Sequence, residues 1–287
     1  MQKKGEKNQI EKMLFELLGS SKAQEVKRVR KAKKMEVIQA KGIEATQARK
    51  ERRDKGTIII SDRDRELLIW INEQMAVSID HLRILLARTS ENKEALADKT
   101  QVSLPQANRM IRRWQGAGLV NLDKINNRVW IWCSAKAIKD FELEYGFYEP
   151  SLWNHIYHVN KIRLNYESRG MKWTPERKLR REYGTGAKWK KHFPDGEITY
   201  KGNQIAVEVE LSNKKTKDRA RIIKQYADAF KFADKDGKNK GLFGYHYSWV
   251  FYFVVDKSEE VIREAVKDHT NIFQVKNLKD VSETQES

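Results

Sequence analysis

Residues 204–211 read Gln-Ile-Ala-Val-Glu-Val-Glu-Leu, and this stretch decides the architecture of the second half of the chain. Its apolar residues alternate with Ala206, Glu208 and Glu210, which is the two-residue period of a β-strand. The alternation places Glu208 and Glu210 on one face of the strand. We therefore predict a strand over 204–211 that presents two carboxylates from the same face.

A third carboxylate lies just upstream, in the sequence Pro194-Asp195-Gly196. A turn at Lys201-Gly202 would fold the intervening strand back on 204–211 as a hairpin, which brings Asp195 to the end where the glutamates lie. Three acids at one edge of a sheet are unfavourable unless a cation joins them, and oxygen ligands suit Mg²⁺ or Mn²⁺. The alternative is that both glutamates occupy the solvated face of a half-exposed strand.

The surrounding sequence predicts an α/β layer. Apolar residues at helical spacing indicate a helix over 151–168 that ends at Gly170. We predict strands over 171–174, 197–200, 249–255 and 272–275, with helices over 216–233 and 258–267. Residues 149–287 are therefore expected to form one α/β domain around a mixed sheet.

The preceding segment contains a basic helix followed by a hairpin. Ser61 and Ser78 are plausible caps of two short helices, and a third helix follows Ser103, with Pro105 in its first turn. Leu104, Ala107, Ile111 and Trp114 are expected to share its core-facing side. Residues 119–120 and 128–132 then predict a two-stranded wing, so residues 57–148 are expected to form a winged helix-turn-helix domain.

The polar side of the third helix carries side chains that read DNA bases. Arginine pairs with guanine, and Asn or Gln pairs with adenine, in the major groove. The predicted DNA contacts are Gln106, Asn108, Arg109, Arg112, Arg113 and, at the start of the second wing strand, Arg128. Winged helices also serve as protein–protein modules, which is the alternative.

The composition favours a polyanionic partner. The 287 residues include 57 Lys and Arg against 40 Asp and Glu, a net charge of +17, and residues 1–56 alone contain 17 Lys and Arg against 8 acids. We expect a basic helical arm over 1–56; a merely solubilising charged helix is the alternative. The single Cys133, the lack of a signal-like segment and the absence of any long apolar run predict a cytoplasmic protein without membrane insertion.

Pro194-Asp195 followed by Glu208-Val209-Glu210 resembles the PD-(D/E)xK nuclease core in a form where glutamate replaces the lysine. Together with the winged helix and the sequence Glu-Leu-Ser at 210–212, residues 57–275 resemble the replication-relaxation family and the MOBC class of conjugative relaxases. The resemblance implies a restriction-endonuclease-like fold, with Asp195, Glu208 and Glu210 as metal-binding and catalytic carboxylates. It also implies Mg²⁺- or Mn²⁺-dependent, site- and strand-specific nicking of DNA at a plasmid or integrative-element transfer or replication origin.

Several further residues are candidates for accessory roles. Lys214 or Lys215 could replace the missing motif lysine at the scissile phosphate, and Glu176 could add a ligand, although a solvated loop position suits Glu176 better. His155 and His158 lie three residues apart on the predicted 151–168 helix and could assist proton transfer. Ordinary hydrogen bonding on the helix face is the alternative for both histidines.

Two other functions remain open. The first is a non-catalytic, origin-binding replication initiator or accessory regulator that keeps the nuclease-like domain as a binding platform. The second is a restriction-type nuclease that breaks both strands, which would need two active sites. The expected partners are double-stranded origin DNA, the single strand exposed by nicking, and other transfer or replication proteins. No phosphate-binding glycine-rich motif is present, so ATP-driven work is not expected.

Overall fold

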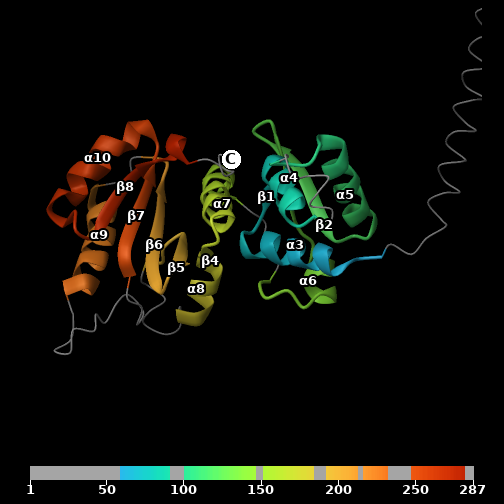
Figure 1. The fold of residues 1–287 in the computed structure, drawn as a ribbon, viewed down its shortest axis with the longest axis horizontal. Helices are drawn as coiled ribbons and strands as arrows, with labels where there is room; N and C mark the ends of the chain where they lie inside the picture. The colour runs from blue at the N-terminus through green and yellow to red at the C-terminus, as the bar shows by residue number, and fades with distance from the viewer. Residues whose placement is uncertain are drawn as a thin grey trace, which may run out of the picture. The chain divides into compact units, whose positions relative to one another are not determined.

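The computed structural model describes residues 59–90, 100–146, 151–183, 192–212, 216–231 and 247–281, all within one compact unit. These segments form a mixed α/β structure with eight α-helices, one three-stranded sheet and one five-stranded sheet (Figure 1). The arm predicted over 1–56 and the candidate Lys214 lie outside them. None of the described helices combines the length and the apolarity that crossing a membrane would need.

Helices and a small sheet make up the first part of the described chain. Its elements are α3 (Asp62–Glu73), β1 (Val77–Ser78), α4 (Ile79–Arg88), α5 (Leu104–Gly116), β2 (Val120–Ile125), β3 (Arg128–Cys133) and α6 (Ala135–Asp140). Ser61, Ser78 and Ser103 cap α3, α4 and α5 as predicted. The strands pair antiparallel in the order β1-β3-β2, and both β1 and α6 are additions to the predicted elements.

A buried carboxylate ties α3 to α5. Asp64 is fully buried; one oxygen accepts from the Ser61 backbone N–H at 2.8 Å, and the other accepts from Trp114 Nε1 at 2.9 Å and from the Arg113 guanidinium. Burial raises the pKa of Asp64, but the hydrogen bonds from Ser61 and Trp114 and the charge of Arg113 bring it below its ordinary value. Arg113, one of the predicted DNA contacts, therefore forms an ion pair with Asp64 inside the protein.

The second part of the chain builds the five-stranded sheet. Its elements are α7 (Trp153–Ser168), β4 (Lys172–Pro175), α8 (Glu176–Tyr183), β5 (Gly196–Tyr200), β6 (Asn203–Glu210), α9 (Thr216–Lys231), β7 (Tyr247–Val254), α10 (Asp256–Val266), β8 (Phe273–Asn277) and the 3-10 turns η3 (Lys267–His269) and η4 (Leu278–Asp280). The strand order is β4-β5-β6-β7-β8. The first three strands are antiparallel and the last three parallel, so the predicted mixed sheet is confirmed.

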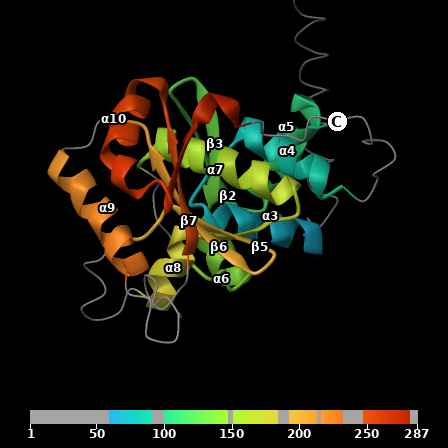
Figure 2. The same ribbon diagram turned by 60° about the vertical axis from the view of Figure 1, so that its left-hand side comes forward.

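Helices cover both faces of this sheet (Figures 1 and 2). Helix α7 packs Val159 and Ile162 on the face that carries Val207, whereas α9 packs Ile222 and Tyr226 on the opposite face. Helix α10 joins α9 on that second face. A strand buried between helix layers must hide both sets of its side chains, including the polar ones.

Helix α7 also contacts the α3–β3 elements. Asn160 Nδ2 donates to the Ala76 carbonyl at 2.9 Å, and Trp153 packs against Trp130 with ring centroids 5.1 Å apart. The buried Arg163 pairs with Glu73 at 2.7 Å. The turn that follows α3 is therefore held against the helix that leads into the large sheet.

Candidate functional site

Strand β6 orients its side chains as the alternation predicts. Val207 and Val209 pack toward α7, and Glu208 and Glu210 lie on the opposite face with Ala206. The two glutamates are only 2% and 3% exposed. The half-exposed strand considered from the sequence is therefore wrong, because helices cover both faces of the sheet.

Asp195 extends the hydrogen-bond ladder just before strand β5 begins at Gly196. Its N–H donates to the Val207 carbonyl at 2.9 Å, and its Oδ2 atom accepts from the Val209 N–H at 2.7 Å. Gly196 is required beside it, since a Cβ there would stand 2.0 Å from a ring carbon of Trp173. These contacts fix the Asp195 carboxylate at the edge of β6.

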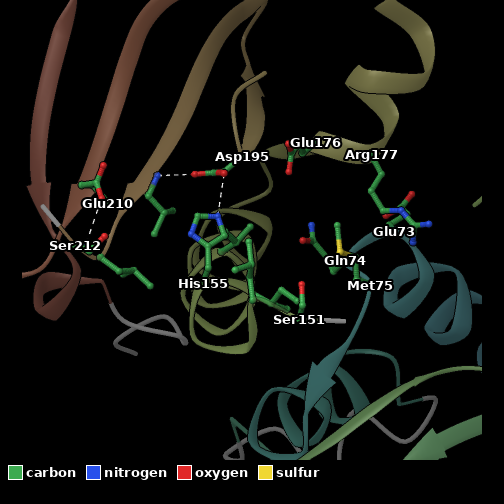
Figure 3. A pocket seen from close by; sticks show the side chains of 15 residues that line it. Glu73, Gln74, Met75, Ser151, His155, Glu176, Arg177, Asp195, Glu210 and Ser212 are labelled. Atoms are coloured by element: carbon green, nitrogen blue, oxygen red, sulfur yellow. Dashed lines mark hydrogen bonds and ion pairs between the residues drawn. The ribbon is translucent and has the colours of Figure 1, made fainter. Parts of the chain in front are cut away.

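His155 reaches Asp195 from α7. Its Nε2 atom lies 2.9 Å from Asp195 Oδ1 (Figure 3). Burial raises the pKa of Asp195, but His155 and the Val209 N–H more than offset burial and hold the pKa below its ordinary value. The structure thus pairs an ionised carboxylate with an imidazole across 40 residues of sequence.

Glu176 begins helix α8 close to Asp195. Burial raises the pKa of Glu176, and the negative charge of Asp195 raises it further, while Arg180 opposes both with a 2.6 Å hydrogen bond. The expected solvated loop position is wrong, because residues 176–183 form a helix and Glu176, its first residue, is half-buried. A carboxyl group whose pKa is raised by burial and by a neighbouring carboxylate is a common feature of functional sites.

Glu208 is enclosed beneath α9. Its Oε1 atom accepts from the Tyr226 hydroxyl and lies 2.8 Å from His192 Nε2. The Gln225 amide donates in turn to the His192 carbonyl at 2.9 Å. Burial and the charge of Glu208 raise the pKa of Tyr226 well above its ordinary value, so Tyr226 stays a neutral hydrogen-bond donor.

A cavity of about 420 Å³ lies beside Asp195 (Figure 3). Its walls come from the turn at 73–75, the start of α7, the start of α8 and the end of β6. Asp195, Glu176 and Glu210 all border it, together with His155, whereas Glu208 does not. The structure therefore brings two of the three predicted carboxylates and one accessory acid to a single hollow.

The donors around the cavity fit a divalent cation in chemistry. Carboxylate oxygens are the ligands that Mg²⁺ and Mn²⁺ prefer, and a cation would relieve the repulsion between Asp195 and Glu176. The geometry is looser: in the part of the chain that the structure describes, no three His, Cys, Asp or Glu side chains gather closely enough to surround one ion. Asp195, Glu176 and Glu210 are the residues that could hold it, by their chemistry and because all three border the cavity.

His158 is separate from this cavity. It packs edge-on against Tyr157, with ring centroids 5.4 Å apart. Burial lowers the pKa of His158 to about 4, and the neighbouring charges of Lys161 and Arg128 lower it further, so the imidazole is neutral at physiological pH. Its partner in the predicted pair, His155, is the one that reaches the acids.

The residues predicted to contact DNA divide into two groups on α5. Arg109 and Arg112 are exposed and form no ion pair within the described segments. Gln106 belongs to the capping box with Ser103, and Asn108 is half-buried. Leu104 was expected in the core but is 46% exposed, because it begins the helix beyond the edge of the packed side.

Arg128 lies at the start of β3 and points to α7. Its guanidinium stacks over the Tyr157 ring at 4.0 Å from the centroid, and Tyr157 stacks on His81 at 4.4 Å. Such a contact stabilises the position of the cation over the ring. Arg128 therefore begins the second strand of the predicted wing and packs against Tyr157 of α7.

Glu197 is a further buried carboxyl group, on β5. It is 2% exposed, and its Oε2 atom has no hydrogen-bond partner among the described residues. Burial raises the pKa of Glu197 to about 7, although a hydrogen bond with Tyr247 works against the increase. Glu197 therefore changes charge near neutral pH.

The raised pKa of Glu197 predicts a stability that falls with pH. The native state holds this proton up to about pH 7 and the unfolded chain only to about 4.5, so stability is lost across that window, by at most about 3 kcal/mol. Glu197→Gln keeps the neutral form, so we expect it to be more stable than the wild type at pH 8. Urea unfolding at pH 5 and pH 8 measures this stability. Glu260→Gln, at an exposed position of α10, is the control. An unchanged pH dependence in Glu197→Gln would contradict the prediction.

The comparisons with known proteins leave the functional assignment to the chain's own residues. No family model, no curated protein and no solved structure matches it. Sequence reasoning missed His192 as a partner of Glu208 and the turn residue Met75 as part of the cavity wall. No local pattern marks either residue, since both act through contacts that are distant in sequence.

Proposed function

We propose that this protein is a DNA endonuclease that nicks one strand at the transfer or replication origin of a mobile genetic element, with Mg²⁺ or Mn²⁺ as cofactor. The observation that carries the proposal is that Asp195, Glu176 and Glu210 all border one cavity, in which His155 lies beside Asp195. The helix, strand meander and parallel strand around this cavity agree with the restriction-endonuclease-like fold that the sequence suggests.

Recognition of duplex DNA is assigned to the first part of the chain. The order α3-β1-α4-α5-β2-β3 agrees with a winged helix, in which the third helix enters the major groove. Arg109 and Arg112 supply exposed guanidinium groups on that helix. The basic residues 1–56 would add phosphate contacts that weaken with salt.

The residues of the cavity take separate roles. Asp195 and Glu210, with Glu176 nearby, would hold the cation, and His155 would orient Asp195 through their hydrogen bond. A bound divalent cation supplies an activated water and offsets the charge of the phosphate. Glu208 is assigned a positioning role, since Tyr226 and His192 fix it under α9.

A second candidate function is supported by the enclosure of Glu208. A predicted metal ligand that accepts from Tyr226 and lies outside the lining of this cavity is what a non-catalytic origin-binding initiator or accessory factor would show. In that case the acidic cavity would bind DNA without cutting it. The two functions differ in whether a DNA strand is cut.

Incubation with supercoiled plasmid carrying the origin of the protein's own genetic element tests the proposal. We expect open circles to form with Mn²⁺ or Mg²⁺ and no conversion with EDTA. Linear DNA as the first product would instead indicate a restriction-type enzyme. DNA binding without cleavage in either metal would favour the initiator.

A further inference from the structure

Gln225 of α9 binds the backbone of the segment that carries Asp195. Its Oε1 atom accepts from the His192 N–H at 3.3 Å, and its Nε2 atom donates to the His192 carbonyl at 2.9 Å. One amide side chain thus binds both backbone polar groups of a residue that is 33 positions away in the sequence. Two such bonds fix the orientation of a peptide as well as its position.

The side chain of His192 gives the same segment a second attachment. Its Nε2 atom lies 2.8 Å from Glu208 Oε1, and the same oxygen accepts from the Tyr226 hydroxyl. Tyr226 is fully buried and follows Gln225 directly on α9. Adjacent residues of α9 therefore hold His192 by its backbone and, through Glu208, by its imidazole.

Phe193 connects the segment to a further acid of the cavity. Its ring is buried, and the Arg180 guanidinium lies over it at 5.1 Å from the centroid. Arg180 also donates from Nε to Glu176 Oε1 at 2.6 Å. A shift of the 192–195 segment would therefore disturb the surroundings of Glu176 as well as Asp195.

The two sides of Asp195 are held by different means. On the C-terminal side, β5 pairs with β6, beginning with Gly196 opposite Val207. On the N-terminal side, residues 192–194 precede the first pair of that ladder, and Pro194 has no N–H to offer. The Gln225 amide supplies on this side the backbone hydrogen bonds that the sheet supplies on the other.

We propose that Gln225 is a positioning residue for the nicking reaction: it holds the 192–195 segment so that the Asp195 carboxylate lies at the cavity, between His155 and the Val209 N–H (Figure 3). The inference rests on the proposed function, because it takes Asp195 to act in catalysis. Gln225 itself is outside the lining of the cavity. A displacement of about 1 Å at a reacting group can cost about a hundredfold in rate, so a residue that acts through Asp195 can control the reaction.

The variant Gln225→Met separates hydrogen bonding from packing. Methionine is unbranched and favours a helix about as well as glutamine, but it has neither an N–H donor nor a strong acceptor for His192. The Val209 amide reports the position of Asp195, whose Oδ2 atom accepts its proton at 2.7 Å. We expect the Val209 amide of the full chain to exchange its proton with solvent about tenfold faster in Gln225→Met, measured by NMR, the scale of two lost hydrogen bonds. Exchange at the wild-type rate would overturn the proposal.

A second amide distinguishes positioning from general loosening of the fold. Val250 of β7 donates to the Ile272 carbonyl at 2.9 Å, so its exchange reports opening of the same sheet. We expect Val250 to exchange at the wild-type rate in Gln225→Met. The matched control Gln274→Met, at a half-buried residue of β8, should leave both amides unchanged. Equal acceleration of Val209 and Val250 in Gln225→Met would assign Gln225 a purely structural role and overturn the proposal.

Tyr226→Phe tests the second attachment of the segment. Phenylalanine keeps the ring that packs against Phe273, with centroids 6.1 Å apart, and removes the hydroxyl that donates to Glu208. We expect the Val209 amide to exchange about threefold faster, the scale of one lost hydrogen bond. Slower exchange of Val209 in this variant would contradict a segment held from α9.

The nicking assay separates this inference from the proposed function. At saturating protein, Gln225→Met should nick origin plasmid at least about tenfold more slowly than the wild type, with an affinity for origin DNA within about twofold. Faster Val209 exchange with an unchanged nicking rate would overturn the positioning role and leave the endonuclease in place. A wild-type protein that never nicks would overturn the endonuclease, and the exchange of Val209 against Val250 would still decide whether Gln225 positions Asp195.

Discussion

Asp195→Asn is expected to lower the rate of plasmid nicking by at least about a hundredfold, the scale of losing one charge-stabilising group from an active site. Asparagine keeps the size of the side chain and one oxygen for the Val209 N–H, which Asp195 Oδ2 binds at 2.7 Å. The variant should therefore fold and lose the negative charge at the cavity. Timed conversion of supercoiled to open-circular plasmid gives the rate.

Asp268→Asn is the matched control for this variant. Asp268 lies exposed on η3 and does not border the cavity, so the same loss of charge there should leave nicking unchanged. Both variants should bind origin DNA at least as well as the wild type, because each removes one negative charge. Nicking at the wild-type rate by Asp195→Asn would remove Asp195 from the catalytic set.

The double variant Arg109→Ala/Arg112→Ala is expected to bind origin DNA at least about thirtyfold more weakly. Both side chains are exposed on α5, and a base-contacting arginine is worth about 1–3 kcal/mol. Anisotropy titrations at several salt concentrations distinguish arginine contacts to bases from arginine contacts to phosphates. Base contacts would weaken binding to the origin more than to unrelated DNA, and phosphate contacts would reduce the salt slope by about 2.

Charge alone must be excluded as the cause of the weaker binding. Arg263→Ala/Lys267→Ala removes two positive charges from the end of α10, where both side chains pair with neighbouring glutamates. We expect this control to change origin affinity by less than about threefold, since paired surface charges contribute little. An equal loss in the two double variants would contradict recognition through α5.

Helix α7 explains why one cavity combines residues from both parts of the chain. On one side, His155 of this helix reaches Asp195. On the other, Trp153 packs on Trp130 of β3, and Asn160 donates to the Ala76 carbonyl. The turn containing Met75 is thereby held at the cavity. The shape of the cavity beside the acids thus depends on how the first part of the chain packs against α7.

Short-range patterns in the sequence account for the local features of this protein. The Ser61 and Ser103 caps, the alternation along β6 and the turn at Lys201-Gly202 all follow from short-range rules of helix capping, strand period and hairpin turns. The hairpin turn also places Asp195 beside β6, because a hairpin of known turn fixes which residues face each other.

Contacts between elements distant in sequence determine which acids border the cavity. Glu176 borders the cavity because an unpredicted helix, α8, begins there, and Glu208 is withdrawn because α9 covers its face and offers Tyr226. His155 reaches Asp195, and Met75 lines the same cavity, through packing between segments distant in sequence. Sequence periodicity assigns a residue to a face, but the partner on that face depends on which element packs against it.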